Sequence, residues 1–212
     1  MENLKVLIFD FDGVIFDSES LHLQAFNEVL KNHDIVISEE DYYKNFISFD
    51  DKGVFEKLIN DKQTVDELIR DKNNFFEKYS IDNGLLFDGV RELIEKLSSK
   101  YILCIGSGAK RSEIISILKK FNLESFFEVI ISADDVNYSK PNPETFQKVI
   151  DILNESENIR AIDCLVIEDT PGGIMAAKSA DMYCASITNT FDESLLKDAD
   201  FIFNSYDEIE DF

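Results

Sequence analysis

Two pairs of acidic residues stand directly behind apolar runs. Asp10 and Asp12 follow LKVLIF, with Gly13 allowing a tight turn, and Glu168 and Asp169 follow CLVI. Carboxylates this close raise each other's pKa unless a counter-charge is present. Mg²⁺ is a suitable counter-charge, because it takes oxygen ligands and does not need a full protein cage. Taken alone, the DxDG pattern also fits a solvated acidic turn.

Two other apolar runs end in residues that could bind phosphate. Ser107 and Gly108 follow YILCIG, and Lys140 opens KPNPETF shortly after EVIIS. If these runs are strands of one parallel sheet, their carboxyl ends meet at one crevice. Acids would hold a metal there, while a hydroxyl and an ammonium bind phosphoryl oxygens. Such a site, with an aligned nucleophile and neutralised charge, is what phosphoryl transfer requires.

The second half of the chain alternates between helical spacing and short apolar runs. Helices are expected over residues 88–99, 110–121, 143–154 and 172–180, and each precedes a strand-like run. This alternation predicts an α/β fold, a doubly wound parallel sheet with helices on both faces.

A helical stretch interrupts this plan after the first strand. Residues 18–32 have helical apolar spacing, with Asp17 or Ser18 as the expected cap, and the pattern stays helical to about residue 80. An inserted domain explains this stretch better than a long crossover. We therefore expect a core of residues 1–16 and 84–212, and a helical domain of residues 17–83.

Four segments carry a family resemblance. FDFDGVIFDSE, GSGAKR, KPNPETF and IEDTPGGIMAAKSADM resemble, in order, the four motifs of haloacid dehalogenase-like hydrolases. The resemblance is to the group that contains β-phosphoglucomutase and small sugar-phosphate phosphatases, and it covers essentially the whole chain. It implies a Rossmann-like core and a small helical cap domain that closes over a magnesium-dependent phosphoryl-transfer site.

The resemblance implies roles for the core acids. Asp10 would attack phosphorus and become an aspartyl phosphate, while Asp12 would protonate the leaving oxygen and then activate the acceptor. Lys140 would neutralise Asp10 and a phosphoryl oxygen. Mg²⁺ would be held by Asp10, the Asp12 carbonyl and Asp169, with Glu168 binding directly or through water.

The resemblance also implies substrate-binding residues. Ser107 and the Gly108 amide would hold phosphoryl oxygens, with Lys110 near the entrance. His22 stands where relatives carry a histidine near the nucleophile loop, and Lys72 resembles a cap lysine that some relatives point at the substrate; both are expected to bind substrate. Two plainer interpretations stay open: His22 as a helix-surface histidine, and Lys72 as a solvated partner of a neighbouring acid, which would be Asp71 or Glu67.

The choice between phosphatase and phosphomutase depends on the insert. Where the mutase would carry an arginine for a distal phosphate, this sequence has Phe49, Asp50 and Asp51, and no arginine occurs between residues 17 and 69. We therefore expect a phosphatase that acts on a small phosphomonoester such as a sugar phosphate, with a β-phosphoglucomutase-type phosphomutase as the alternative.

Two other classes of protein fit the sequence less well. A non-catalytic binding module with this fold would be expected to lose one of the site residues, and none is lost. A response-regulator-like receiver lacks the helical insertion and is usually much shorter.

One residue departs from the family pattern. Relatives usually have glycine before Met182, at a left-handed helix cap, and this chain has Asp181. Aspartate tolerates that backbone better than most residues, so we expect a local cost in stability and no change of function.

Composition limits the partners and the compartment. The chain has 212 residues and a net charge of −22, which argues against nucleic acid or anionic membrane as a partner. Three widely spaced cysteines in apolar runs are expected to be buried thiols, namely Cys104, Cys164 and Cys184. With no signal-peptide pattern and no bilayer-length apolar run, we expect a cytoplasmic monomer that binds a small phosphorylated metabolite.

Overall fold

The computed structural model describes residues 4–47, 49–155 and 157–209, which divide into two compact units. The core unit comprises Met1–Asp17 and Leu85–Phe212, and the insert unit comprises Ser18–Gly84. The assignment of the insert unit as a cap over the site stays a prediction.

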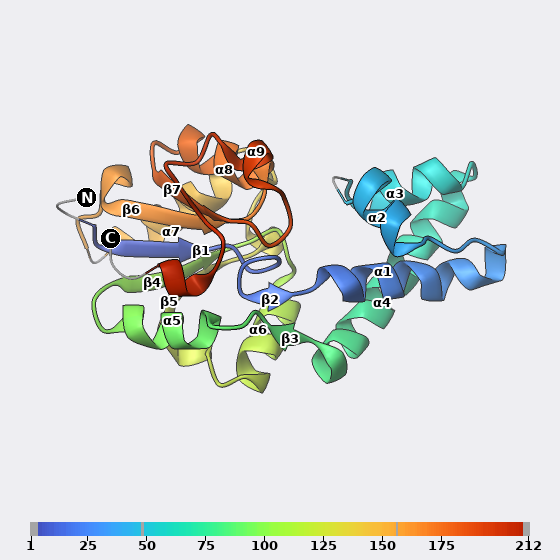
Figure 1. Cartoon of the computed structure of the whole chain (residues 1–212), viewed down its shortest axis with the longest axis horizontal. Coiled ribbons are helices and arrows are strands. Elements are labelled where there is room, and N and C mark those ends of the chain that lie inside the picture. Colours follow the sequence, from blue (N-terminus) through green and yellow to red (C-terminus); the bar gives the residue numbers. More distant parts are fainter. Residues whose placement is uncertain (1–3, 48, 156, 210–212) are drawn as a thin grey trace. The chain divides into compact units, whose positions relative to one another are not determined.

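The core unit is built on a six-stranded sheet in the order β5-β4-β1-β6-β7-β8 (Figure 1). All neighbouring strands pair in parallel. The strands are β1 (Val6–Phe9), β4 (Ile102–Gly106), β5 (Phe127–Ile131), β6 (Cys164–Glu168), β7 (Tyr183–Ile187) and β8 (Phe201–Phe203). This arrangement confirms the predicted doubly wound α/β fold.

Helices cover both faces of this sheet, with α5 and α6 on one side and α7 and α8 on the other (Figure 1). Each helix expected in this half is present, and its ends lie within two residues of the expected ones. The bounds are α5 (Val90–Ser98), α6 (Arg111–Lys120), α7 (Glu144–Leu153), α8 (Pro171–Ser179) and α9 (Glu193–Leu196), with short 3₁₀ turns η2 (Glu124–Phe126), η3 (Ala133–Asp135), η4 (Ala161–Asp163) and η5 (Tyr206–Glu208).

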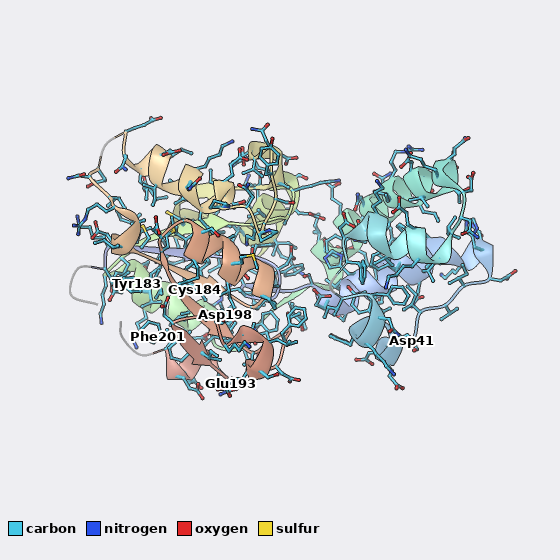
Figure 2. The ribbon with its side chains drawn as sticks, turned by 90° about the horizontal axis from the view of Figure 1, so that it is seen from above. Asp41, Tyr183, Cys184, Glu193, Asp198 and Phe201 are labelled. Carbon is cyan, nitrogen blue, oxygen red and sulfur yellow. The ribbon has the colours of Figure 1, made fainter. Side chains whose placement is uncertain are left out.

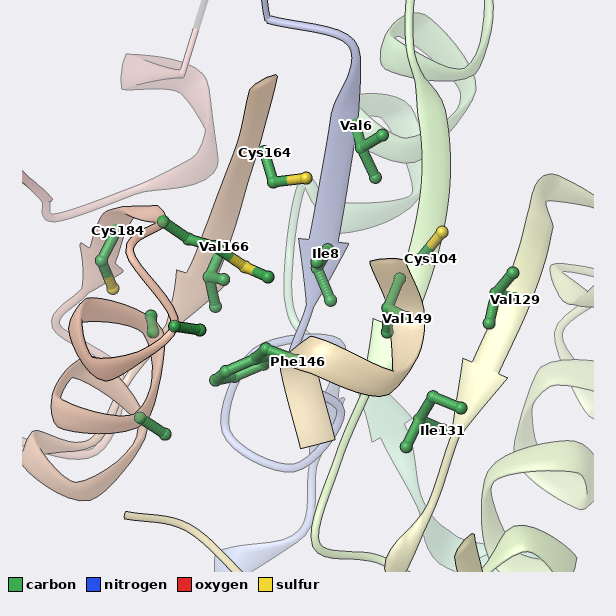
Figure 3. Packing of buried hydrophobic residues seen from close by; sticks show 14 of the residues in the cluster. Val6, Ile8, Cys104, Val129, Ile131, Phe146, Val149, Cys164, Val166 and Cys184 are labelled. Atoms are coloured by element: carbon green, nitrogen blue, oxygen red, sulfur yellow. The ribbon is translucent and has the colours of Figure 1, made fainter. Parts of the chain in front are cut away.

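Apolar side chains between the sheet and α7 form the core of this unit (Figure 3). Ile8 of β1, Val166 of β6 and Phe146 of α7 are all fully buried. Cys104, Cys164 and Cys184 are buried as free thiols, as expected. At the sheet edge, Tyr183 and Cys184 of β7 lie near Phe201 of β8 (Figure 2), whose strand pairs with β7.

Asp181 has the left-handed backbone that its place in the sequence predicts, with φ of 59°. It lies in the turn after α8, where its amide donates to the Lys178 carbonyl at 3.1 Å. Asparagine and aspartate are the non-glycine residues most often found in this conformation.

The insert unit is helical and has its own apolar core. Its elements are α1 (Glu19–Leu30), η1 (Lys31–His33), α2 (Glu39–Asn45), α3 (Asp51–Leu58) and α4 (Lys62–Asn83). Its core side chains come from all four α-helices and include Phe26, Tyr42, Phe55 and Leu68. The chain leaves and re-enters the core unit through β2 (Phe16–Asp17) and β3 (Leu85–Leu86), which pair antiparallel.

The expected capping of α1 is wrong in one respect. Ser18 stands at the N-cap position, but its side chain makes no cap hydrogen bond, and Asp17 belongs to β2. Ser18 has helical φ and ψ, whereas a capping side chain normally needs an extended backbone at this position. Asp50 and Asp61 have that extended backbone and do cap α3 and α4.

Within the described part of the chain, none of the helices is both long enough and apolar enough to cross a lipid bilayer.

Candidate active site

The site is positioned by the two strands at the centre of the sheet. After β1 the chain builds outwards through β4 and β5, and it then returns to form β6 on the other side of β1. The loops of such adjacent strands diverge and leave a crevice at their carboxyl ends. Asp10 follows β1 and Glu168 ends β6, and the Asp10 amide donates to the Ile167 carbonyl at 2.9 Å.

Lys140 joins the two acids. Its Nζ lies 3.0 Å from Asp10 Oδ1 and 2.6 Å from Glu168 Oε1. The three side chains are only 12 %, 11 % and 0 % exposed. Charges in such a place require partners, because removing one partner leaves another buried charge uncompensated. The predicted convergence of Asp10, Lys140 and Glu168 is therefore present in the structure.

Burial and the shared ammonium set opposite pKa shifts on the two carboxyls. Burial raises the pKa of Asp10 to about 7, although Lys140 pulls it down. Burial also acts to raise the pKa of Glu168, but Lys140 and the Thr170 hydrogen bonds outweigh it and the pKa falls. Burial alone would lower the pKa of Lys140, yet the two acids raise it, so the lysine stays charged.

The acids can hold a divalent metal ion. Asp10, Glu168 and Asp169 are all buried, and each offers a carboxylate oxygen within 4.8 Å of the others. Asp10 and Glu168 share one ammonium, so these acids carry excess negative charge when both are ionised. An all-oxygen donor set with excess negative charge fits Mg²⁺.

Two glycines allow the backbone to approach these carboxylates. A Cβ on Gly13, whose φ is +75°, would lie 1.9 Å from Asp169 Oδ2. A Cβ on Gly173, in the first turn of α8, would lie 1.8 Å from the Glu168 carboxylate. Either side chain would displace a predicted metal ligand.

Thr170 links Glu168 to the start of α8. Its hydroxyl donates to Glu168 Oε2 at 3.0 Å and accepts from the Gly173 amide at 3.0 Å. The amides of Asp169 and Thr170 donate to the same Oε2 at 3.0 Å each. Thr170 and Gly173 were not predicted as site residues, although a Thr-Pro-Gly-Gly run at a helix start is a recognisable signal.

The predicted phosphate-binding residues lie at the same edge of the sheet. Ser107 follows β4, the neighbour of β1, and it is buried, with its Oγ accepting from the Ala109 amide at 3.1 Å. Gly108 is exposed, as is Lys110 at the N-cap of α6. Asp12 is half-buried, two residues beyond Asp10.

The other two candidates, His22 and Lys72, lie in the insert unit and contact each other. Lys72 Nζ lies 2.9 Å from His22 Nδ1 and 2.7 Å from Asp51 Oδ1. The His22 ring stacks on Phe76 at 4.1 Å, so His22 is not a simple surface histidine. Burial first, and then Lys72, lowers the pKa of His22 well below its usual value.

The interpretation of Lys72 as a solvated partner of Asp71 or Glu67 is wrong. Lys72 is 2 % exposed, because it lies on the same face of α4 as the buried Leu68 and Phe76, four residues to either side. Both Asp71 and Glu67 lie on the exposed face of the helix.

The doubly wound sheet and the buried acid–lysine cluster at its switch point define an α/β enzyme with a charged, metal-compatible site. The profile of the haloacid dehalogenase-like hydrolases matches residues 7–187, and the chain belongs to this family.

Curated relatives and solved structures agree with this assignment. A phosphorylated carbohydrates phosphatase of Thermotoga maritima is 30 % identical over 181 residues, which are 84 % of this chain and 82 % of that protein. The validoxylamine A 7′-phosphate phosphatase of Streptomyces hygroscopicus subsp. limoneus is 26 % identical over 208 residues, 97 % and 95 % of the two chains.

Among solved structures, a haloacid dehalogenase-like hydrolase from Streptococcus pneumoniae has the same fold, with a TM-score of 0.85 at 20 % identity, and the match covers 99 % of this chain and 98 % of that one. The family and its phosphatase members class the chain as a phosphoric monoester hydrolase.

Gly173→Ala should disturb the site, because its methyl group would overlap the Glu168 carboxylate. We expect a clear loss of phosphatase activity and a fall in Tm of roughly 2–12 °C, the range for overpacking in a chain of this size. Activity on p-nitrophenyl phosphate and a thermal melt measure both. Gly172→Ala is the matched control, since a Cβ there meets nothing within 4 Å. Equal activity in the two variants would contradict this account of Gly173.

Proposed function

We propose that the protein is a Mg²⁺-dependent phosphatase that hydrolyses a small phosphomonoester of the phosphorylated-carbohydrate type through an aspartyl phosphate on Asp10. The observation that carries the proposal is the buried group of Asp10, Glu168 and Asp169 with Lys140 bound between two of them. The substrate class is supported by two relatives, whose names refer to phosphorylated carbohydrates and to validoxylamine A 7′-phosphate.

Each residue has a distinct task in this proposal. Lys140 holds Asp10 in place and neutralises charge as the Asp10 oxygen attacks phosphorus. Asp12 protonates the leaving oxygen and later takes a proton from water. The Ser107 hydroxyl and the Gly108 amide bind phosphoryl oxygens. Asp10, the Asp12 carbonyl, Glu168 and Asp169 are the groups that would hold Mg²⁺, which supplies positive charge to the phosphoryl oxygens.

A panel of phosphorylated metabolites tests the proposal. Purified protein is incubated with each compound, with Mg²⁺ or with EDTA, and free phosphate is measured. Magnesium-dependent release from sugar phosphates is expected. A protein that releases phosphate from no member of the panel, or releases it equally well in EDTA, would contradict the proposal.

Asp10→Asn should abolish turnover, by at least about 10³-fold, because an amide oxygen is a poor nucleophile. The fold should persist. The pKa of Asp10 is about 7 in the folded protein, against an ordinary value of 3.8. Folding therefore becomes less favourable as the pH rises from 3.8 to about 7, and above pH 7 the ionised carboxylate opposes folding in full. Without metal at pH 8, Tm should therefore be unchanged or higher in Asp10→Asn.

Asp12→Asn is the companion variant and should slow turnover by about 10²–10⁴-fold. Acid-quenched protein is examined by mass spectrometry for a phosphoryl adduct on the peptide that contains Asp10. An adduct found on another residue, or full activity in Asp10→Asn, would refute the mechanism.

Metal binding should depend on pH because it requires ionised Asp10, whose pKa is raised to about 7 in the metal-free protein. Below pH 7 the metal must displace a proton, so affinity should rise by up to about tenfold per pH unit and level off above pH 7. Calorimetry with Mn²⁺ in buffers of different ionisation enthalpy measures the affinity and the released proton. In Asp10→Asn this dependence should vanish, and a flat profile in the unmodified protein would show that Asp10 is not the titrating ligand.

A phosphomutase remains the second candidate, and one contact in the insert unit weighs against it. A mutase must hold a bisphosphate and therefore needs a second phosphate site. Lys72 of the insert unit resembles a lysine that binds substrate in some relatives. Its ammonium is already paired with Asp51 at 2.7 Å, so it is a poor second phosphate site. Phosphate is gripped best by arginine, and none occurs between residues 17 and 69.

With β-glucose 1-phosphate and a trace of the 1,6-bisphosphate, phosphate release should exceed the formation of glucose 6-phosphate. Water should compete well for the aspartyl phosphate, because the bisphosphate is not retained by a second phosphate-binding site. A coupled assay for glucose 6-phosphate, run beside a phosphate assay, compares the two rates. Isomerisation that greatly outruns phosphate release would replace the phosphatase assignment with the mutase.

A further inference from the structure

The loop after β1 is held by residues from the far end of the chain. Asn189 Nδ2 donates to the Gly13 carbonyl at 2.7 Å, across 176 residues of sequence. The Tyr206 hydroxyl donates to the Val14 carbonyl and accepts from Asn189 Nδ2 at 2.9 Å. Asn189 and Tyr206 are thus hydrogen-bonded to each other, and together they fix two consecutive carbonyls of this loop.

The Tyr206 side chain is held in a fixed position by its surroundings. Tyr206 is buried in η5, and its ring lies 6.5 Å from that of Phe87, just after β3. In Figure 1 the C-terminal turn η5 lies beside α5, and the two elements are in contact. Burial raises the pKa of the Tyr206 hydroxyl, so it keeps its proton and remains a donor.

The loop they hold is the one that sets the spacing of the acids. Gly13 packs so closely on Asp169 that a Cβ there would lie 1.9 Å from Oδ2. The turn is compact, with the Gly13 amide bonded to the Phe16 carbonyl at 3.0 Å and the Ile15 amide to the Phe11 carbonyl at 2.8 Å. A shift of the carbonyls at residues 13 and 14 would therefore change the distance between the loop and Asp169.

We propose that Asn189 and Tyr206 are positioning residues that fix residues 10–14 and so keep Asp10 and Asp169 at a separation that binds one divalent cation. The statement about cation binding rests on the proposed function. The statement that Asn189 and Tyr206 fix the loop rests only on their hydrogen bonds.

Tyr206→Phe and Asn189→Ala test the proposal, with two readouts that need no substrate. Hydrogen–deuterium exchange of peptides covering residues 10–17 should be faster in both variants. The dissociation constant for Mn²⁺, followed by electron paramagnetic resonance, should rise about three- to tenfold, because each variant loses one hydrogen bond to the loop and the bond between Asn189 and Tyr206.

Asn154→Ala is the matched control. Asn154 also ties down a backbone segment, with its Nδ2 donating to the Ile159 carbonyl at 3.0 Å and its Oδ1 accepting from the Ile159 amide at 2.7 Å. That segment precedes β6 at the opposite end of the strand from Glu168. Asn154→Ala should lower Tm about as much as Tyr206→Phe and Asn189→Ala do. Hydrogen–deuterium exchange in residues 10–17 and the affinity for Mn²⁺ should both stay unchanged in this control.

The outcomes separate this inference from the proposed function. Unchanged exchange in residues 10–17, or faster exchange with unchanged Mn²⁺ affinity, overturns the positioning role. Failure of the unmodified protein to hydrolyse any phosphomonoester removes the proposed function only, because both readouts are made without substrate. An unmodified protein that binds no Mn²⁺ overturns both.

Discussion

Two buried carboxylates that share one ammonium group are the constraint on which the site depends. Asp10 and Glu168 both lie within 3.0 Å of Lys140 Nζ and are almost closed to water. One positive charge cannot balance both acids when both are ionised. The group must therefore take up a proton or a cation, and the pKa of Asp10 near 7 shows how closely these alternatives are balanced in the metal-free protein.

The fold meets this constraint with backbone groups from separate parts of the chain. Glu168 receives three hydrogen bonds on Oε2 from the start of α8, and these bonds help to keep it ionised. Apart from Lys140, Asp10 Oδ1 receives a hydrogen bond from the Phe11 amide at 2.7 Å, so its own loop stabilises its charge less than the loop of Glu168 does. The two acids thus differ because their loops offer different numbers of donors, and the less stabilised one is the proposed nucleophile.

The sequence predicts the fold well because apolar periodicity follows burial directly. The strands and helices of the core unit appear within a few residues of their expected bounds, and the strand ends converge because the sheet is parallel. Contacts between distant residues that do not both lie at strand ends were not predictable. The Lys72 partner Asp51 is 21 residues away, and Tyr206 reaches Val14 across 192 residues. Neither spacing follows from a local period, and Ser18 fails as a cap because of its backbone angles.

In the proposed function, substrate choice is assigned to the insert unit and phosphoryl-transfer chemistry to the core unit. Lys72 Nζ lies 4.9 Å and 5.1 Å from the ring centroids of Phe26 and Phe76, in addition to its contacts with Asp51 and His22. Lys72 is 2 % exposed, so separating its charge from Asp51 is costly. A substrate anion would have to repay that cost before gaining from Lys72, so a neutral, hydroxyl-bearing leaving group suits this unit better than a second phosphate.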